Sequence, residues 1–164
     1  MTSKLKTDVL ETVSGSGTIA LTNQLSGMTS ASVPSGSVVQ VVQSVLTSGV
    51  NVNSASYVAT GHTASITPTS SSNKILITLS GGACMMNNVG RELETIIYRD
   101  ATALSNAISK HTSARDPMYT VHSITYLDSP ATTSSITYQA YGKGAGVYYN
   151  TGGAVTLTLM EIQG

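Results

Sequence analysis

The sequence contains no phenylalanine and no tryptophan, so its aromatic content consists of eight tyrosines. The single cysteine, Cys84, excludes a framework of intrachain disulfides. No apolar run approaches the roughly 18 residues that a membrane-spanning helix needs, and no secretory signal peptide opens the chain. We therefore expect a protein that is made in a cytoplasm and does not insert into a membrane.

Charge is also scarce, since Asp, Glu, Lys and Arg make up 10% of the chain, against about a quarter in typical domains. The formal net charge is +0, which provides no field to steer the protein to nucleic acid. None of these residues occurs within residues 12–73. Because the cores of protein interfaces are depleted in charge, we expect much of this stretch to be covered by other chains. The alternative is a solvated surface rich in Ser and Thr.

Ser and Thr account for about three residues in ten, well above ordinary usage, and most apolar residues are Val, Ile, Leu or Ala. Side chains branched at Cβ favour extended structure. From residue 37 onward, turn signals separate a series of strand-like runs, which we predict at 38–46, 57–59, 64–67, 74–79, 94–99, 119–127, 135–141 and 154–162. Seven or eight strands without a long helix predict an all-β fold, an antiparallel β-sandwich of the jelly-roll-like kind.

The segments outside these strand-like runs also lead to structural predictions. Residues 1–36 have too few apolar positions for a core, so we predict an extended N-terminal arm followed by one β domain at 37–164. We interpret 48–55 as a linker and 142–146 as a hairpin turn. Two helical turns are conceivable within 101–117, but Pro117 and the mixed polar composition favour a long loop.

Two strands have informative patterns. The run 38–46 is nearly continuous in apolar residues, which predicts burial on both faces. In the last strand, Val155, Leu157 and Leu159 share one face with Glu161, by the two-residue period of a strand. The opposite face suits contact with another subunit; it carries Thr156, Thr158, Met160 and Ile162.

Residues with catalytic or metal-binding potential are few. His62, His111 and His122 have no partner at a metal-ligand spacing, so we expect no metal and no cofactor, and a packed or hydrogen-bonded His122. Cys84 is expected to be a small buried hydrophobe. Glu92 and Glu94 can share a strand face beside Arg91, which favours ion pairs over a glycosidase pair. A nucleophile elbow and a phosphate-binding Walker loop are absent, so we expect no enzymatic activity.

The tyrosines cluster late in the chain. Tyr148, Tyr149 and Asn150 follow the glycine-rich segment that contains Lys143. A tyrosine combines an apolar ring with a polar tip, which suits contact with a sugar or a protein. We therefore predict an exposed contact site made by these four residues. Equally, the tyrosines can replace the missing Phe and Trp in the core.

Four stretches resemble short virion proteins of tailed phages, of the fibre, knob or capsid-decoration type with a C-terminal jelly-roll-like domain. They read ASITPTSSSNKILI at 64–77, IYRD at 97–100, YLDSPATTSSITY at 126–138 and TLTLMEI at 156–162. The resemblance covers residues 37–164, and residues 7–36 look like the adaptor segments that precede such domains. It implies a homotrimer on the virion and supplies no catalytic residues.

On this resemblance we expect a phage virion structural protein, a trimeric fibre or knob anchored to other virion proteins through residues 1–36. Its outer loops would contact a glycan or protein of the host surface. A capsid decoration (cement) protein is the nearest alternative. A carbohydrate-binding lectin is a further one, with Tyr148, Tyr149 and Asn150 as its sugar platform.

Overall fold

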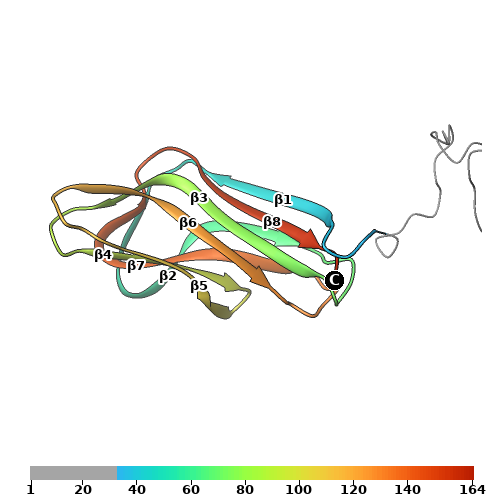
Figure 1. The fold of residues 1–164 in the computed structure, drawn as a ribbon. Coiled ribbons are helices and arrows are strands. Elements are labelled where there is room, and N and C mark those ends of the chain that lie inside the picture. Colours follow the sequence, from blue (N-terminus) through green and yellow to red (C-terminus); the bar gives the residue numbers. More distant parts are fainter. Residues whose placement is uncertain (1–32) are drawn as a thin grey trace, which may run out of the picture.

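The computed structural model describes residues 33–164, which form eight antiparallel strands (Figure 1). The strands are β1 (Val38–Leu46), β2 (Val50–Ile66), β3 (Lys74–Met86), β4 (Glu92–Arg99), β5 (Thr102–Thr112), β6 (Met118–Asp128), β7 (Ile136–Asn150) and β8 (Val155–Ile162). This part of the chain contains no helix, and so none that could cross a membrane. Most of the predicted N-terminal arm, residues 1–32, lies outside the described residues.

The strands form two four-stranded layers, β1-β8-β3-β6 and β2-β7-β4-β5. The pairs β1–β8, β2–β7, β3–β6 and β4–β5 are nested around the β4–β5 turn, as in a long hairpin rolled over on itself. This is the strand arrangement of a jelly roll. Met85 and Met86 of β3 also pair with Tyr148 and Val147 of β7, so the hydrogen bonding continues from one layer to the other. The predicted antiparallel, jelly-roll-like β-sandwich is confirmed.

The core lies between the layers and is built by alternation along the strands. In β8, Val155, Leu157, Leu159 and Glu161 are all buried, as the sequence pattern predicted. Tyr138 and Tyr149 are among the largest fully buried side chains, so two tyrosines take the place of the missing Phe and Trp. A fully buried side chain of the size of Leu contributes roughly 1.5–3 kcal/mol, and aliphatic residues make up most of this core.

The first strand differs from its prediction. Burial of residues 38–46 on both faces is wrong, because Val38, Val41 and Val45 are exposed. Among the described strands β1 pairs with β8 alone and lies at the edge of its layer, and the face of β1 that points away from the other layer is open to solvent. The predicted linker at 48–55 is also wrong, since β2 begins at Val50 and runs to Ile66.

Two predicted loops are strands. The long loop at 101–117 is wrong because Thr102–Thr112 forms β5, which pairs with β4 after a turn at Asp100, where φ is 50°. The hairpin turn at 142–146 is wrong because these residues lie inside β7. Glycine is needed there for close approach of the backbones: a Cβ on Gly144 would collide with the carbonyl oxygen of Glu92 on β4.

Candidate functional site

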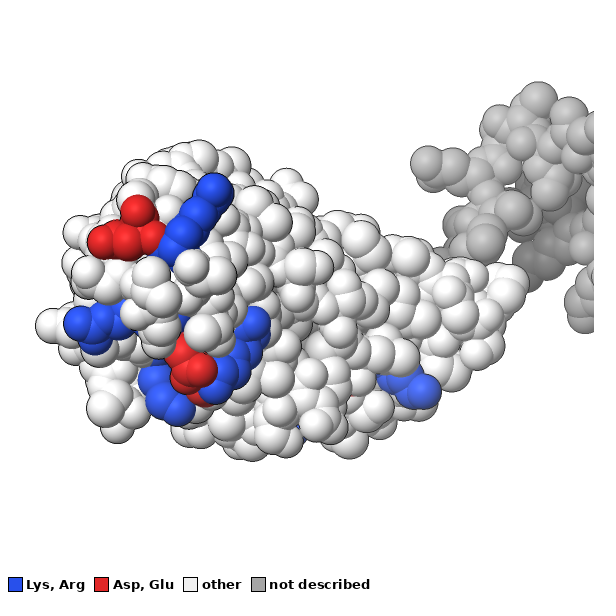
Figure 2. All heavy atoms as spheres, turned by 60° about the vertical axis from the view of Figure 1, so that its left-hand side comes forward, with Lys and Arg blue, Asp and Glu red and all other residues white. Residues whose placement is uncertain are grey.

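Charged side chains gather at the end of the sandwich that is remote from the C-terminus (Figure 2). Turns and strand ends contribute these residues, namely Arg91, Glu92, Glu94, Lys110, Arg115, Asp116 and Lys143. Away from this end, the charged side chains that reach the surface of residues 33–164 are Lys74, Arg99 and Asp100. Residues 33–164 thus form a domain that is charged at one end and nearly uncharged over the rest of its surface.

A hollow of about 320 Å³ lies among these charges. Its lining comes from three strands and one turn, and consists of Ser54, Ala55, Gly90, Arg91, Glu92, Glu94, Lys143, Gly144 and Ala145. Pockets for small ligands span roughly 300–1,000 Å³. This hollow therefore has room for one small ligand, of the size of a single sugar ring.

The hollow exists because two strands depart from regular pairing beside it. Gly144 has no side chain, which lets β7 approach the backbone of β4 closely. On the other side, β2 pairs Ser54 with Gly144 and Val58 with Gly142, so three residues of β2 face one residue of β7. Such a bulge changes the direction in which side chains point, and bulges are frequent next to functional sites.

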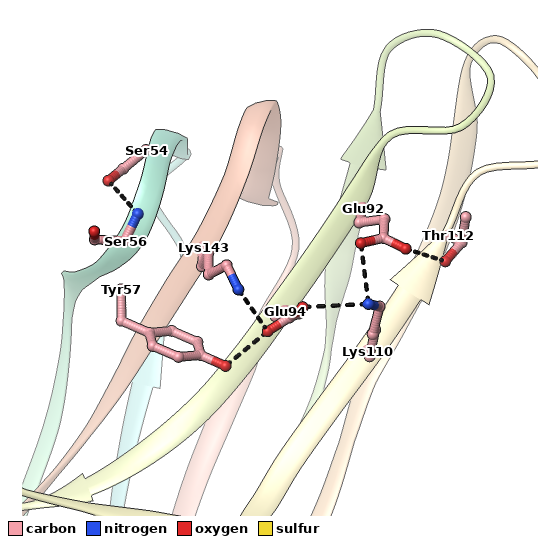
Figure 3. A network of polar contacts seen from close by, with 8 residues as sticks. All are labelled: Ser54, Ser56, Tyr57, Glu92, Glu94, Lys110, Thr112 and Lys143. Carbon is pink, nitrogen blue, oxygen red and sulfur yellow. Dashed lines mark hydrogen bonds and ion pairs between the residues drawn. The ribbon is translucent and has the colours of Figure 1, made fainter.

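Glu94 is the centre of a polar network beside the hollow (Figure 3). Its Oε2 accepts a hydrogen bond from the Tyr57 hydroxyl at 2.8 Å and one from Lys143 Nζ at 3.2 Å. Its Oε1 forms an ion pair with Lys110 Nζ at 3.3 Å, and Lys110 also pairs with Glu92 Oε2 at 3.0 Å. Lys143 Nζ lies 5.4 Å from the centroid of the Tyr57 ring, a distance at which a cation is attracted to the ring face.

The network sets the protonation of its members. The hydrogen bond from Tyr57, helped by those from Lys143 and Lys110, lowers the pKa of Glu94, so this carboxyl is ionised at neutral pH. Burial and the adjacent Glu94 raise the pKa of Tyr57 to about 12. A general acid for glycoside hydrolysis needs a raised carboxyl pKa. The environment of Glu94 does the reverse, which suits fixed charge and ligand binding better than proton transfer.

Arg91 occupies the rim of the hollow with an exposed side chain and a fixed backbone. Its amide nitrogen donates to Ser113 Oγ at 3.1 Å, and its carbonyl oxygen accepts from the Ser113 amide at 2.8 Å. The Ser113 hydroxyl in turn bonds to the Asn88 carbonyl oxygen. Within residues 33–164 the guanidinium makes no ion pair.

Of the four residues of the predicted contact site, two are fully buried and two are partly exposed. Tyr149 and Asn150 are both 0% exposed, so the prediction that they form an exposed contact surface, or a sugar platform, is wrong. Tyr148 is half-buried, and Lys143 lines the charged hollow. The alternative, that tyrosines fill the core, is confirmed for Tyr149 and Tyr138.

Asn150 is buried because its side chain bonds to three neighbouring segments. Its Nδ2 donates to the carbonyl oxygens of Ser48 and Gly153, at 3.1 and 3.2 Å. Its Oδ1 accepts from the backbone amides of Ala83 and Gly152, both at 3.2 Å. Asn150 thus ties the β1–β2 and β7–β8 connections to β3, a structural task.

A second polar cluster lies in the core around Tyr149. The Tyr149 hydroxyl meets His62 Nδ1 at 3.1 Å, and its carbonyl oxygen meets His122 Nε2 at 2.8 Å. Cys84 Sγ lies 3.1 Å from the same His122 nitrogen. Burial lowers the pKa of His122 to about 4 and raises the pKa of Cys84 to about 12. The predictions of a packed, hydrogen-bonded His122 and a buried Cys84 are confirmed.

Tyr57 and Lys110 belong to the charged site although no sequence pattern marks them as members of it. Tyr57 begins a short predicted strand and Lys110 lies in the predicted loop at 101–117. Only strand pairing defines the face on which each side chain lies. No group of three or more His, Cys, Asp or Glu side chains that could hold a metal ion occurs in the part of the chain that the structure describes.

No protein-family model matches the chain, and no curated protein matches its sequence significantly.

Proposed function

We propose that the protein is a structural component of a phage virion, a homotrimeric fibre or knob. Residues 1–36 anchor it to other virion proteins, and its charged end contacts the host surface. The observation that carries this proposal is the outer face of the layer β1-β8-β3-β6, on which Lys74 at the start of β3 is the one charged side chain of the described strands, together with the concentration of charge at the other end.

Cross-strand pairing arranges this outer face in rows. Val41 of β1 pairs with Met160 of β8, which pairs with Leu76 of β3, which pairs with Leu127 of β6. These four residues form the apolar row, and its outer members are well exposed, Val41 at 56% and Leu127 at 46%. The next row is polar but uncharged, and consists of Gln43, Thr158, Thr78 and Thr125.

Such a face is suited to association between copies of this chain. Surfaces of monomers normally carry mixed charge, whereas the cores of interfaces are depleted in it. Covering the face would also protect the edges of β1 and β6, which charged side chains do not guard. The number of three copies comes from the resemblance to phage virion proteins.

Cyclic symmetry would give the trimer two different ends, one with the entering chains and one with the charged hollows. In a closed ring every copy has the same polarity along the axis. The entering chains at Val38 would lie together at one end of the trimer, and the hollows would lie at the other. That polarity suits an attachment protein with an anchored end and a contacting end.

The oligomeric state of the purified protein tests the interface. We expect native mass spectrometry or light scattering to give three times the mass of one chain. Val41→Lys or Leu127→Lys should give folded monomers, because a lysine would then be desolvated at the interface. Ile108→Lys is the matched control, since Ile108 is an exposed apolar residue of β5 in the other layer. A folded wild-type monomer at micromolar concentration would contradict the trimer.

The place of the protein in a particle is tested by cryo-electron microscopy of purified virions. Trimeric density at the tail or a vertex, with residues 33–164 pointing outward, supports the fibre or knob. Density that leads from the arm into the capsid shell would make the protein a decoration protein instead. Absence from the particle would overturn the virion assignment altogether.

A further inference from the structure

We propose that the charged hollow binds a sugar that carries a carboxylate, such as a terminal uronic or sialic acid residue of a surface glycan. The inference rests on the host-contact part of the proposed function, to which it gives a ligand class. Its residues are those that line the hollow, with Arg91 as the group that recognises the carboxylate.

Arg91 is placed for this task by its surroundings. Its amide and carbonyl groups both bond to Ser113, so the point on the rim from which the side chain departs is fixed. Its guanidinium makes no ion pair within the described residues, because Lys110 and Lys143 occupy the two carboxylates of the hollow. A guanidinium is a planar fork of donors that matches a carboxylate with two parallel hydrogen bonds.

Lys143 adds a second donor on the β7 side. Within residues 33–164 its Nζ makes one hydrogen bond, to Glu94 Oε2 at 3.2 Å, and the side chain is partly exposed. An ammonium has three donors, so it retains capacity for a ligand oxygen. The cationic side chains Arg91, Lys110 and Lys143 exceed the anionic side chains Glu92 and Glu94 by one positive charge. That excess matches a ligand with a single negative charge.

The remainder of the hollow suits a neutral, hydroxyl-rich body attached to that charge. Gly144 and Ala145 supply no large side chain, so a sugar ring can approach the backbone of β7. Ser54 Oγ accepts from the Ser56 amide at 3.1 Å and keeps its own proton for a ligand oxygen. Glu92 is exposed at the rim and can accept hydrogen bonds from sugar hydroxyls.

Mixed charge also disfavours other anions. Inorganic phosphate carries one or two negative charges at neutral pH and at most two hydroxyl groups, fewer than a sugar ring offers to Glu92 and Glu94. Those two carboxylates would repel it more strongly than they repel a monoanionic sugar. The hollow of about 320 Å³ is too small to take more than one side chain of an acidic peptide.

Titration of the full-length protein, followed by amide shifts in NMR, tests the proposal. The probes are methyl glucuronide and sialyllactose, each compared with its neutral counterpart, methyl glucoside or lactose. We expect saturable shifts around residues 54–55, 90–94 and 143–145 with either acidic sugar. The neutral counterparts should bind about tenfold more weakly, as the loss of a charge-assisted hydrogen bond implies.

Variants identify the residue responsible. Arg91→Gln should weaken binding of the acidic sugars to the level of the neutral ones, and Arg91→Lys should restore part of it. Lys74→Gln removes an exposed cation far from the hollow and should change nothing. Equal binding of acidic and neutral sugars, tighter binding of inorganic phosphate, or undiminished binding by Arg91→Gln would each overturn the proposal.

The sugar titration and the assembly measurements test the two proposals independently, so either proposal can be refuted without the other. A trimer found on virions that binds no acidic sugar would refute the ligand class and leave the virion assignment intact. Acidic-sugar binding by a protein that is absent from particles would uphold the site and refute the virion assignment.

Discussion

Asn73 donates its side-chain amide to Glu161 Oε1 at 2.6 Å, although 88 positions separate the two residues in the chain. The same carboxylate accepts from the Thr69 amide at 2.6 Å, from Thr69 Oγ1 at 2.8 Å and from Gln40 Nε2 at 2.6 Å. Glu161 is fully buried, and within residues 33–164 no Lys or Arg forms an ion pair with it. Four neutral donors therefore hold a charged group that joins the end of β8 to β1 and to the turn before β3.

Glu161→Gln should destabilise the fold markedly. Burial raises the pKa of Glu161, but the hydrogen bonds outweigh this effect and keep the pKa below its ordinary value, so the native side chain is ionised. A glutamine would present an NH₂ group to donors and leave at least one of them unpaired, which costs about 2 kcal/mol. Urea unfolding at pH 7 measures the change. Glu92→Gln, at an exposed ion pair, is the control and should cost less than about 0.5 kcal/mol.

Stability should fall between pH 7 and pH 5 because of His122. Burial lowers the pKa of His122 to about 4, whereas an unfolded histidine titrates near 6.5. Between these values the unfolded state binds a proton that the native state does not, so acidification favours unfolding, by about 2 kcal/mol at pH 5. Burial lowers the pKa of His62 as well, which adds to the effect in the same direction.

Denaturation curves at pH 7 and pH 5 measure this loss, and His122→Gln should make it smaller. The pKa values of Glu94 and Glu161 are lowered, so these carboxylates titrate below this window and do not obscure it. An unchanged pH dependence in the variant would rule out His122 as the cause.

Gly144→Ala should be destabilising, whereas Gly49→Ala should be nearly neutral. A Cβ at Gly144 would collide with the carbonyl oxygen of Glu92 and with Val147, so β4 and β7 would have to separate. Overpacking of this kind costs roughly 1–3 kcal/mol. A Cβ at Gly49 meets its nearest atom at 3.5 Å, an ordinary contact. Thermal unfolding of both variants gives the comparison, and equal stability would contradict the close approach of the two strands.

Cys84 should resist thiol reagents in the folded protein. It is fully buried, so a reagent cannot reach it. Burial also raises the pKa of Cys84 to about 12, so the reactive thiolate does not form at pH 8. We expect no modification by a chromogenic disulfide reagent in buffer and complete modification in guanidinium. Ser134→Cys, at an exposed position between β6 and β7, should react at once and shows that the reagent is active. Rapid reaction of native Cys84 would mean that the layers open readily.

Strands with regular alternation could be predicted from the sequence. The face shared by Val155, Leu157, Leu159 and Glu161 follows from a two-residue period, and so does the core position of His122. β5 could not be recognised in this way, because Leu104 and Ala107 are its only buried apolar residues. Its extended form depends on pairing with β4, and that pairing is not visible in a single segment.

The candidate site was predictable only in part, for the same reason. Alternation alone places Glu92 and Glu94 on one face. Lys110 and Lys143 join them because both lie opposite Glu94 in the registers of β5 and β7. Tyr57 reaches the same carboxylate from the bulge in β2. Register and bulges arise from long-range packing, so no local signal shows that Tyr57, Lys110 and Lys143 meet at one carboxylate.

The antiparallel ladder between β1 and β8 gives the domain a mechanical direction. Val38, where the chain enters, pairs with Ile162 near the C-terminus, and the strands run lengthwise from there towards the charged end. A pull between the entering chain and the hollow acts along the strands and loads the ladder bonds together, in shear. A pull between the two termini would instead peel β1 from β8 one bond at a time. We expect single-molecule extension to need much more force in the first geometry, the direction in which an anchored protein is loaded when its far end is held.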